Sequence, residues 1–177
     1  MNCQTKPDPG PIGPDTSDRS PSCIERYART LADARRVADE MAAATDDPIT
    51  VSIGLTELIL NGIEHGNLEI GSTLKAQLLE EERWDLEIAE RLTRSPWGER
   101  QVKILMMIGD DGYEWIISDE GAGFDWRNRD KDIPTATLNG RGLLLAEQMS
   151  FDSLSYNEAG NVAMARKFKR SQAEPDA

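Results

Sequence analysis

The fold is decided by the stretch Glu57-Leu58-Ile59-Leu60-Asn61-Gly62-Ile63-Glu64-His65-Gly66-Asn67, which is apolar and yet carries an acid, an amide and an imidazole at regular spacing. At 3.6 residues per turn, Glu57, Asn61 and His65 fall four residues apart and stack along one face of a helix. Another face carries residues suited to the core: Val51, Leu55, Leu58 and Gly62. We therefore predict a helix with one face in the core and one face that carries chemistry.

Start signals place this helix and a second one before it. Asp46-Asp47-Pro48 puts an acid at the cap and proline at the first helical position, where its missing N–H costs nothing. Upstream, Thr30 resembles the N-cap of a helix that ends near Ala44 and has apolar residues at helical spacing: Leu31, Ala34, Val37, Ala38 and Met41. Residues 24–29 predict a short strand before it.

Strand signals dominate the second half of the chain. Runs at 102–108 and 113–118 flank Gly109-Asp110-Asp111-Gly112 and predict a hairpin, and runs at 151–156 and 162–168 predict another. Between them, residues 125–139 predict a loop, and Gly140-Arg141-Gly142 opens a helix towards Met149. The order predicts an α+β, two-layer sandwich with a mixed, mostly antiparallel sheet and helices on one face.

Residues 71–100 differ in character, because leucines and isoleucines alternate there with dense Glu, Asp and Arg. We predict a solvated amphipathic helix broken at Ser95-Pro96-Trp97-Gly98. Two interpretations stay open: the charged face of an ordinary helix, or an insertion that binds a partner.

Length and charge restrict the class of protein. A chain of 177 residues suggests one domain, which we place at 23–170 between a disordered segment at 1–22 and a polar tail at 171–177. The net charge of −12 argues against a nucleic-acid partner. Two cysteines, Cys3 and Cys23, give neither a disulfide framework nor a CxxC site. Without a long apolar run or a signal peptide, we expect a cytoplasmic protein with no membrane partner.

Three polar patterns occur in an order that predicts a Mg-nucleotide site. Asn61 offers an uncharged oxygen to Mg²⁺, and Glu57, one turn earlier, could reach the group that attacks the terminal phosphate. Asp119, at the end of a strand, is an acceptor for an exocyclic amine such as that of adenine. Gly121 and Gly123 let the backbone lie against base and sugar. Gly140, Arg141 and Gly142 offer a helix N-terminus to phosphate, and the loop at 125–139 would be a lid.

These patterns resemble the ATP-binding domain of the GHKL superfamily, the Bergerat fold of gyrase, heat-shock-ninety chaperones, histidine kinases and mismatch-repair ATPases. Glu57 to Asn61 resembles its N box, Asp119-Glu120-Gly121-Ala122-Gly123-Phe124 its first glycine box, and Gly140-Arg141-Gly142-Leu143 its second. The resemblance spans roughly residues 24–169. Within the superfamily, the chain is most similar to anti-sigma-factor serine/threonine-protein kinases.

The resemblance implies a role for each matched residue. Glu57 would be the general base, Asn61 the Mg²⁺ ligand and Asp119 the adenine contact. The remaining ATP-binding residues would be Gly121, Gly123 and Phe124 beside the base, Gly140, Arg141, Gly142 and Leu143 at the phosphates, and His65 near them. His65 could instead interact with the dipole at the helix end, and Arg141 could be a surface side chain.

The sequence departs from the family pattern in two places. The last strand of the family commonly carries a threonine near adenine, whereas Gly160-Asn161-Val162-Ala163-Met164 has no hydroxyl. The segment 71–100 is longer than in compact anti-sigma kinases. The first departure concerns one base contact, and the second concerns the partner or the interface between subunits.

Two functions from different classes follow from the resemblance. The first is a homodimeric serine kinase that uses ATP and Mg²⁺ to phosphorylate an antagonist (anti-anti-sigma-like) protein and that sequesters a sigma factor or similar regulator. The second is a regulatory module in which ATP gates partner binding without phosphotransfer. No phosphoacceptor-histidine motif or dimerising helical hairpin precedes the ATP module, so we do not expect a complete histidine kinase. An ATPase that drives conformational work would need further domains.

Overall fold

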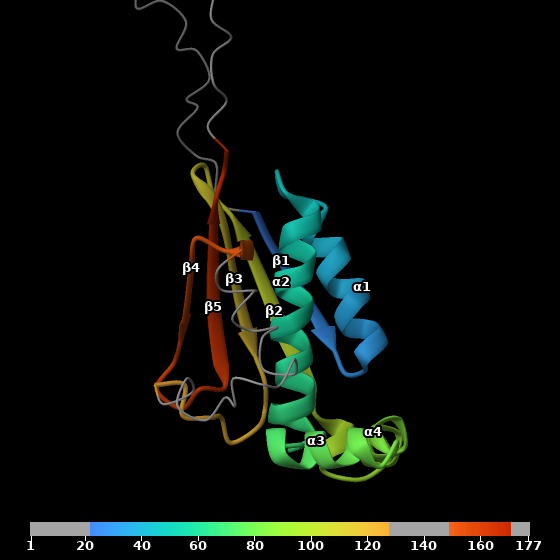
Figure 1. Cartoon of the computed structure of the whole chain (residues 1–177). Coiled ribbons are helices and arrows are strands. Elements are labelled where there is room, and N and C mark those ends of the chain that lie inside the picture. The colour runs from blue at the N-terminus through green and yellow to red at the C-terminus, as the bar shows by residue number, and fades with distance from the viewer. Residues whose placement is uncertain (1–21, 128–148, 171–177) are drawn as a thin grey trace, which may run out of the picture.

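The computed structural model describes residues 22–127 and 149–170, in which five strands form one sheet and helices pack against one of its faces (Figure 1). The elements in chain order are β1 (Ser22–Ala28), α1 (Leu31–Ala42), α2 (Pro48–Asn61), the π-helix η1 (Gly62–Asn67), α3 (Ser72–Glu80), α4 (Trp84–Leu92), the 3₁₀ turn η2 (Trp97–Glu99), β2 (Val102–Ile108), β3 (Gly112–Ser118), β4 (Ser153–Tyr156) and β5 (Val162–Phe168). The predicted α+β two-layer sandwich is confirmed.

Several predicted segments lie outside the described residues. They are the N-terminal segment up to residue 21, the tail from 171 and the loop from 128 to 139. The second glycine box, with Gly140, Arg141, Gly142 and Leu143, lies outside as well.

The strand order is β1-β2-β3-β5-β4, and all four neighbouring pairs are antiparallel. The expectation of a mixed sheet is therefore wrong. Both predicted hairpins form, but β5 rather than β4 pairs with β3. In this sheet β1, β3 and β4 run in one direction and β2 and β5 run in the other, so strands of like direction are never neighbours.

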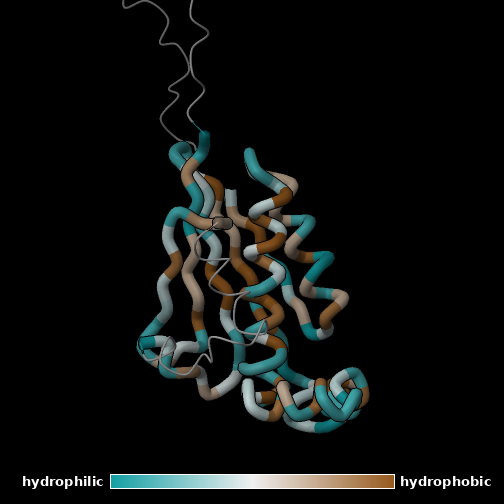
Figure 2. Tube along the Cα trace, in the orientation of Figure 1, coloured by the Kyte–Doolittle hydropathy of each residue, from teal (hydrophilic) through white to brown (hydrophobic). Residues whose placement is uncertain are grey.

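The core lies between the sheet and helices α1 and α2. Figure 2 shows hydrophobic residues along the strands and along α2. Trp115 at the centre of β3 is fully buried and contacts Phe151, with 5.6 Å between ring centroids. Val37 and Met41 of α1 and Leu55 of α2 are also fully buried. Each such side chain contributes roughly 1.5–3 kcal/mol by leaving water.

Helix α1 begins as predicted at Thr30, whose hydroxyl accepts from the Asp33 N–H in a capping box. Helix α2 begins after Asp47 with Pro48 at its first turn and reaches the predicted end at Gly66 and Asn67 through the wider turn of η1. There the Leu68 N–H donates to the Ile63 carbonyl. Wide turns of this kind are frequent at functional sites.

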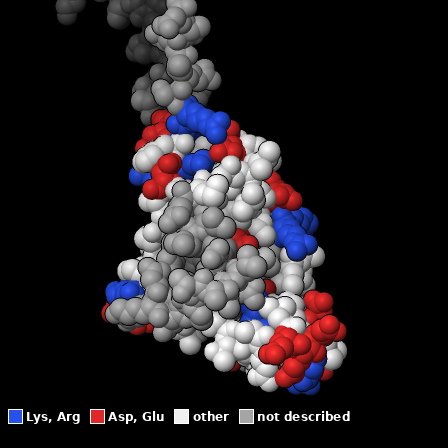
Figure 3. Space-filling view, viewed as in Figure 1, with Lys and Arg blue, Asp and Glu red and all other residues white. Residues whose placement is uncertain are grey.

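Residues 71–100, called the insertion below, form two short helices rather than the single helix that was predicted. Helix α3 ends at Glu80, Glu82 adopts a positive φ of 54°, and α4 starts at Trp84. Leu78 of α3 and Ile88 of α4, on either side of the bend, are both buried. The predicted break after α4 is confirmed, because η2 follows there. Figure 3 shows acidic side chains gathered over α3 and α4.

The face of the sheet opposite α1 and α2 is not covered by any helix of the described residues (Figure 1). Met164 and Phe168 of β5 and Tyr27 of β1 expose 39%, 52% and 48% of their surface there. Leu105 and Ile116 are half-buried beside Met164, because the register aligns the three residues across β2, β3 and β5. Antiparallel sheets commonly leave one face to solvent, but that face is then polar. We call this surface the open face.

No helix within 22–127 or 149–170 has the length and apolar character required to span a membrane.

Candidate functional site

The candidate site lies where the end of β3 meets the last turns of α2 and η1. Asp119 directly follows β3, and its side chain packs against Gly62 and Gly66 of the facing helix. A Cβ at residue 66 would overlap the Asp119 carboxyl group. The structure therefore brings the predicted adenine contact directly against the helix that carries the predicted N box.

The Asp119 carboxylate is held in one orientation. Its Oδ1 accepts from the Gly121 N–H at 2.8 Å, and the Asp119 N–H donates to the Asn161 carbonyl at 3.0 Å. Burial raises the pKa of the Asp119 carboxyl, while the Gly121 N–H and the positive charge of Arg100 act in the opposite direction. A fixed and partly desolvated carboxylate is a strong acceptor for a hydrogen-bond donor on a ligand.

The glycines of the first glycine box meet protein backbone on the side where a Cβ would stand. A Cβ on Gly121 would overlap the backbone of Gly66, and one on Gly123, at φ 82°, would overlap the Ala159 carbonyl. These positions need glycine so that the box fits between η1 and the β4–β5 turn. The structure thus gives these glycines a packing role, and their predicted contact with the base stays a prediction.

Glu57 and Asn61 lie one turn apart on α2, and both are partly exposed. Within the described residues, no hydrogen bond or ion pair holds either side chain, so both are available to a ligand. His65 differs, because its Nδ1 bonds the Ile70 carbonyl just beyond the helix end. This contact agrees with the alternative in which His65 interacts with the helix terminus.

The described residues contain no group of three or more His, Cys, Asp or Glu side chains that could hold a metal ion. Mg²⁺ does not require such a group, because it is commonly held by one or two protein oxygens together with the phosphates of a nucleotide. Asn61 is the residue of the predicted N box whose amide oxygen could serve in this way.

A cavity of about 550 Å³ borders the first glycine box and is lined by Ala122, Gly123, Phe124, Asp125, Arg127, Glu158 and Ala159. The predicted ligand contact Phe124 is 40% exposed and packs edge-on against Tyr156. Asp119 and Asn61 do not line this cavity, so it lies beside the Asp119 carboxylate rather than around it.

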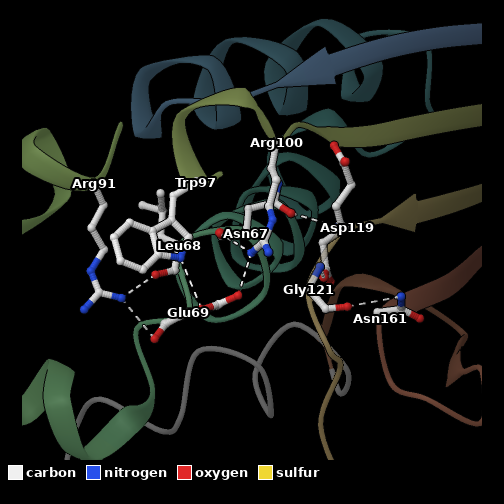
Figure 4. A network of polar contacts seen from close by, with 10 residues as sticks. Asn67, Leu68, Glu69, Arg91, Trp97, Arg100, Asp119, Gly121 and Asn161 are labelled. Carbon is white, nitrogen blue, oxygen red and sulfur yellow. Dashed lines mark hydrogen bonds and ion pairs between the residues drawn. The ribbon is translucent and has the colours of Figure 1, made fainter. Parts of the chain in front are cut away.

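Sequence reasoning missed the buried polar residues that surround the end of η1. Asn67 is 2% exposed, and its Oδ1 accepts from the Glu120 N–H at 2.8 Å. Glu64 is 5% exposed and pairs with Lys75 of α3 at 2.5 Å. Figure 4 shows Asn67 between Asp119 and residues of the insertion. The spacing of residues along a helix or strand could not predict these contacts, because the partners lie 11 to 53 residues apart in sequence.

Comparison with known proteins places this site in a family. The sequence profile of the family described as "Histidine kinase-like ATPase domain" matches residues 21–167, which is most of the chain. A comparison with curated proteins found no match. Among the described residues, the matched range contains the strands β1 to β4, β5 up to its last residue but one, the helix with Glu57 and Asn61, and Asp119. The chain therefore belongs to the histidine kinase-like ATPase domain family, and ATP is the ligand that this family implies.

Proposed function

We propose that the chain is a serine kinase of the anti-sigma-factor type, which transfers the γ-phosphoryl group of ATP to an antagonist protein. In its free state, the protein would instead sequester a sigma factor or a comparable regulator. The observation that carries the proposal is Asp119, a half-buried and fixed carboxylate packed against the helix that presents Glu57 and Asn61. That arrangement suits an adenine base at Asp119 and phosphates along the exposed side of α2.

In the proposed reaction, Glu57 accepts the proton of the substrate serine hydroxyl as the serine Oγ bonds to the γ-phosphorus. The bond between that phosphorus and the β–γ bridging oxygen breaks, and ADP leaves. Asn61 would hold Mg²⁺, whose charge would neutralise the phosphate oxygens. Asp119 would accept from the exocyclic amine of adenine and fix the nucleotide in the site.

Replacing Glu57 with glutamine tests the transfer step. The variant should keep ATP affinity within about twofold and lose about 10²–10⁴-fold in the rate of phosphoserine formation, the range typical of a missing general base. The rate is measured in single turnovers with γ-labelled ATP, Mg²⁺ and a purified anti-anti-sigma-like domain as the phosphoacceptor. Glu80→Gln on the exposed side of α3 is the matched control and should leave the rate unchanged.

A regulatory module without phosphotransfer makes the opposite prediction. Its wild type would bind ATP and the antagonist tightly and yet form no phosphoserine. In that case Glu57→Gln would change nothing, and the kinase proposal would be wrong.

The open face supports a homodimer as the working state. An isologous dimer needs one self-complementary patch, and Met164 ends an apolar row with Leu105 and Ile116 on the open face. It is 39% exposed. We expect Met164→Lys to convert a dimer to a monomer in sedimentation velocity. Ile53→Lys, at an exposed residue of α2, is the matched control and should leave the dimer intact. A monomeric wild type at high concentration would contradict this assignment.

A further inference from the structure

Three side chains of the insertion form hydrogen bonds with the turn that follows η1. Arg91 of α4 donates through Nη1 to the carbonyls of Leu68 and Glu69. Trp97 donates to the Glu69 carboxylate at 3.2 Å. Arg100 donates to the same carboxylate at 2.7 Å and to the Asn67 carbonyl at 2.9 Å (Figure 4). Main-chain carbonyls at a helix end have no partner within the helix, and here side chains of the insertion supply the donors.

A residue of η1 beside this turn is also hydrogen-bonded to the backbone next to Asp119. Asn67 is buried, and its Oδ1 accepts from the N–H of Glu120, the residue between Asp119 and Gly121. The Glu120 carboxylate also accepts from the Gln101 N–H, next to Arg100, at 2.8 Å. The peptide that follows Asp119 is therefore tied both to the end of η1 and to the end of the insertion.

We propose that Asn67 and Arg100 are positioning residues, through which the insertion fixes the direction of the Asp119 carboxylate and so sets the preference of the site for adenine. This inference rests on the proposed contact between Asp119 and the adenine amine. Arg100 donates to the main-chain carbonyl of Asn67, whose side chain accepts from the Glu120 N–H. The next N–H in the chain, that of Gly121, donates to the Asp119 carboxylate. The charge of Arg100 also favours the ionised form of Asp119 by lowering its pKa, against the effect of burial.

The test must separate positioning from general support of the fold, because the Arg100 side chain is only 20% exposed and its loss will also lower stability. Inosine triphosphate provides the separation. It shares the sugar and triphosphate of ATP but carries a carbonyl where adenine has the amine. The ratio of the two dissociation constants, measured by titration calorimetry on one preparation, does not depend on the fraction of protein that is folded.

We expect the wild type to favour ATP over inosine triphosphate by about tenfold to 100-fold, which corresponds to a hydrogen bond to a charged group. Arg100→Gln and Asn67→Leu should each weaken ATP binding by about tenfold and change inosine triphosphate binding less than twofold. Arg94→Gln is the matched control in the same insertion, because Arg94 pairs only with the exposed Glu90 among the described residues. It should leave both affinities unchanged.

Each other result contradicts the inference. Equal weakening of both nucleotides by Arg100→Gln would show that the network only supports the fold. Unchanged affinity for ATP in both variants would show that Asp119 is positioned without it. If the wild type does not distinguish the nucleotides, or if Asp119→Asn keeps the wild-type preference, the adenine contact itself is wrong and the proposed site fails with it.

Discussion

Replacing Asp119 with asparagine should weaken ATP binding by about tenfold to 100-fold and remove the preference for ATP over inosine triphosphate. The physical reason is that a charged acceptor contributes about 1.5–3 kcal/mol to a hydrogen bond, whereas an amide at the same place offers less and presents a donor as well. Asparagine matches aspartate in size, so the close packing against Gly66 is kept. The measurement is titration calorimetry with both nucleotides at neutral pH.

The same substitution should not destabilise the protein without ligand. Burial raises the pKa of Asp119, so the folded state binds this proton more tightly than the unfolded state does. The resulting stability is present below the unfolded pKa and is lost as the pH rises through the folded pKa. At neutral pH the carboxylate is ionised at a cost, and Asp119→Asn removes that cost. Thermal unfolding of the variant at pH 7 should thus occur at the same temperature or higher.

The pH dependence of ATP binding gives an independent check on Asp119. Because an ionised carboxylate is required as acceptor, ATP affinity should fall as the pH decreases through the raised pKa. Asp119→Asn should lack this fall. A variant with wild-type ATP affinity would remove Asp119 from the site altogether.

Local sequence signals were sufficient for the elements that place this site. Thr30 with Asp33, Asp47 with Pro48, and the Asp-Gly pair before β3 each fix a helix or strand boundary through contacts within a few residues. The apolar face of α2 and the alternation in β2 and β3 then determine which side becomes buried. Such signals predict elements well because each depends on neighbours in sequence.

Signals of the same kind could not predict the strand pairing or the bend in the insertion. Whether β4 or β5 lies beside β3 is a choice between two strands that both lie far from β3 in sequence. The bend at Glu82 lies between Leu78 and Ile88, both of which are buried. The tie between Asn67 and Glu120 likewise spans 53 residues. Each of these features is decided by tertiary contacts.

The candidate site also has features that the sequence predicted and features that it did not. The order of the motifs predicted that Asp119 and the N box serve one site, and in the structure Asp119 lies against Gly62 and Gly66 of the helix that continues from the N box. The role of the glycines as places where backbones meet was not predicted, because glycine at these positions is equally consistent with a base lying against the chain.

Replacing Gly66 with alanine should therefore damage the site more than any other single methyl group added to η1. The new Cβ would overlap the Asp119 carboxyl group, and the residue would also press on Gly121, which lies against the backbone of Gly66. Overpacking of this kind costs roughly 1–3 kcal/mol, which exceeds the gain of about 1 kcal/mol from alanine in a helix. We expect a net loss of stability in chemical denaturation and a loss of ATP affinity of at least tenfold.

Gly71→Ala is the matched control, because a Cβ at that residue would have no atom within 4 Å. Its cost should be no more than about 0.5–1 kcal/mol, since glycine caps a helix somewhat better than alanine does, and ATP affinity should not change. The comparison isolates the contact between η1 and Asp119, since both substitutions add the same methyl group within five residues of each other. If Gly66→Ala bound ATP as the wild type does, the nucleotide would not depend on the position of Asp119, and a site centred on the cavity beside Phe124 would explain ATP binding better.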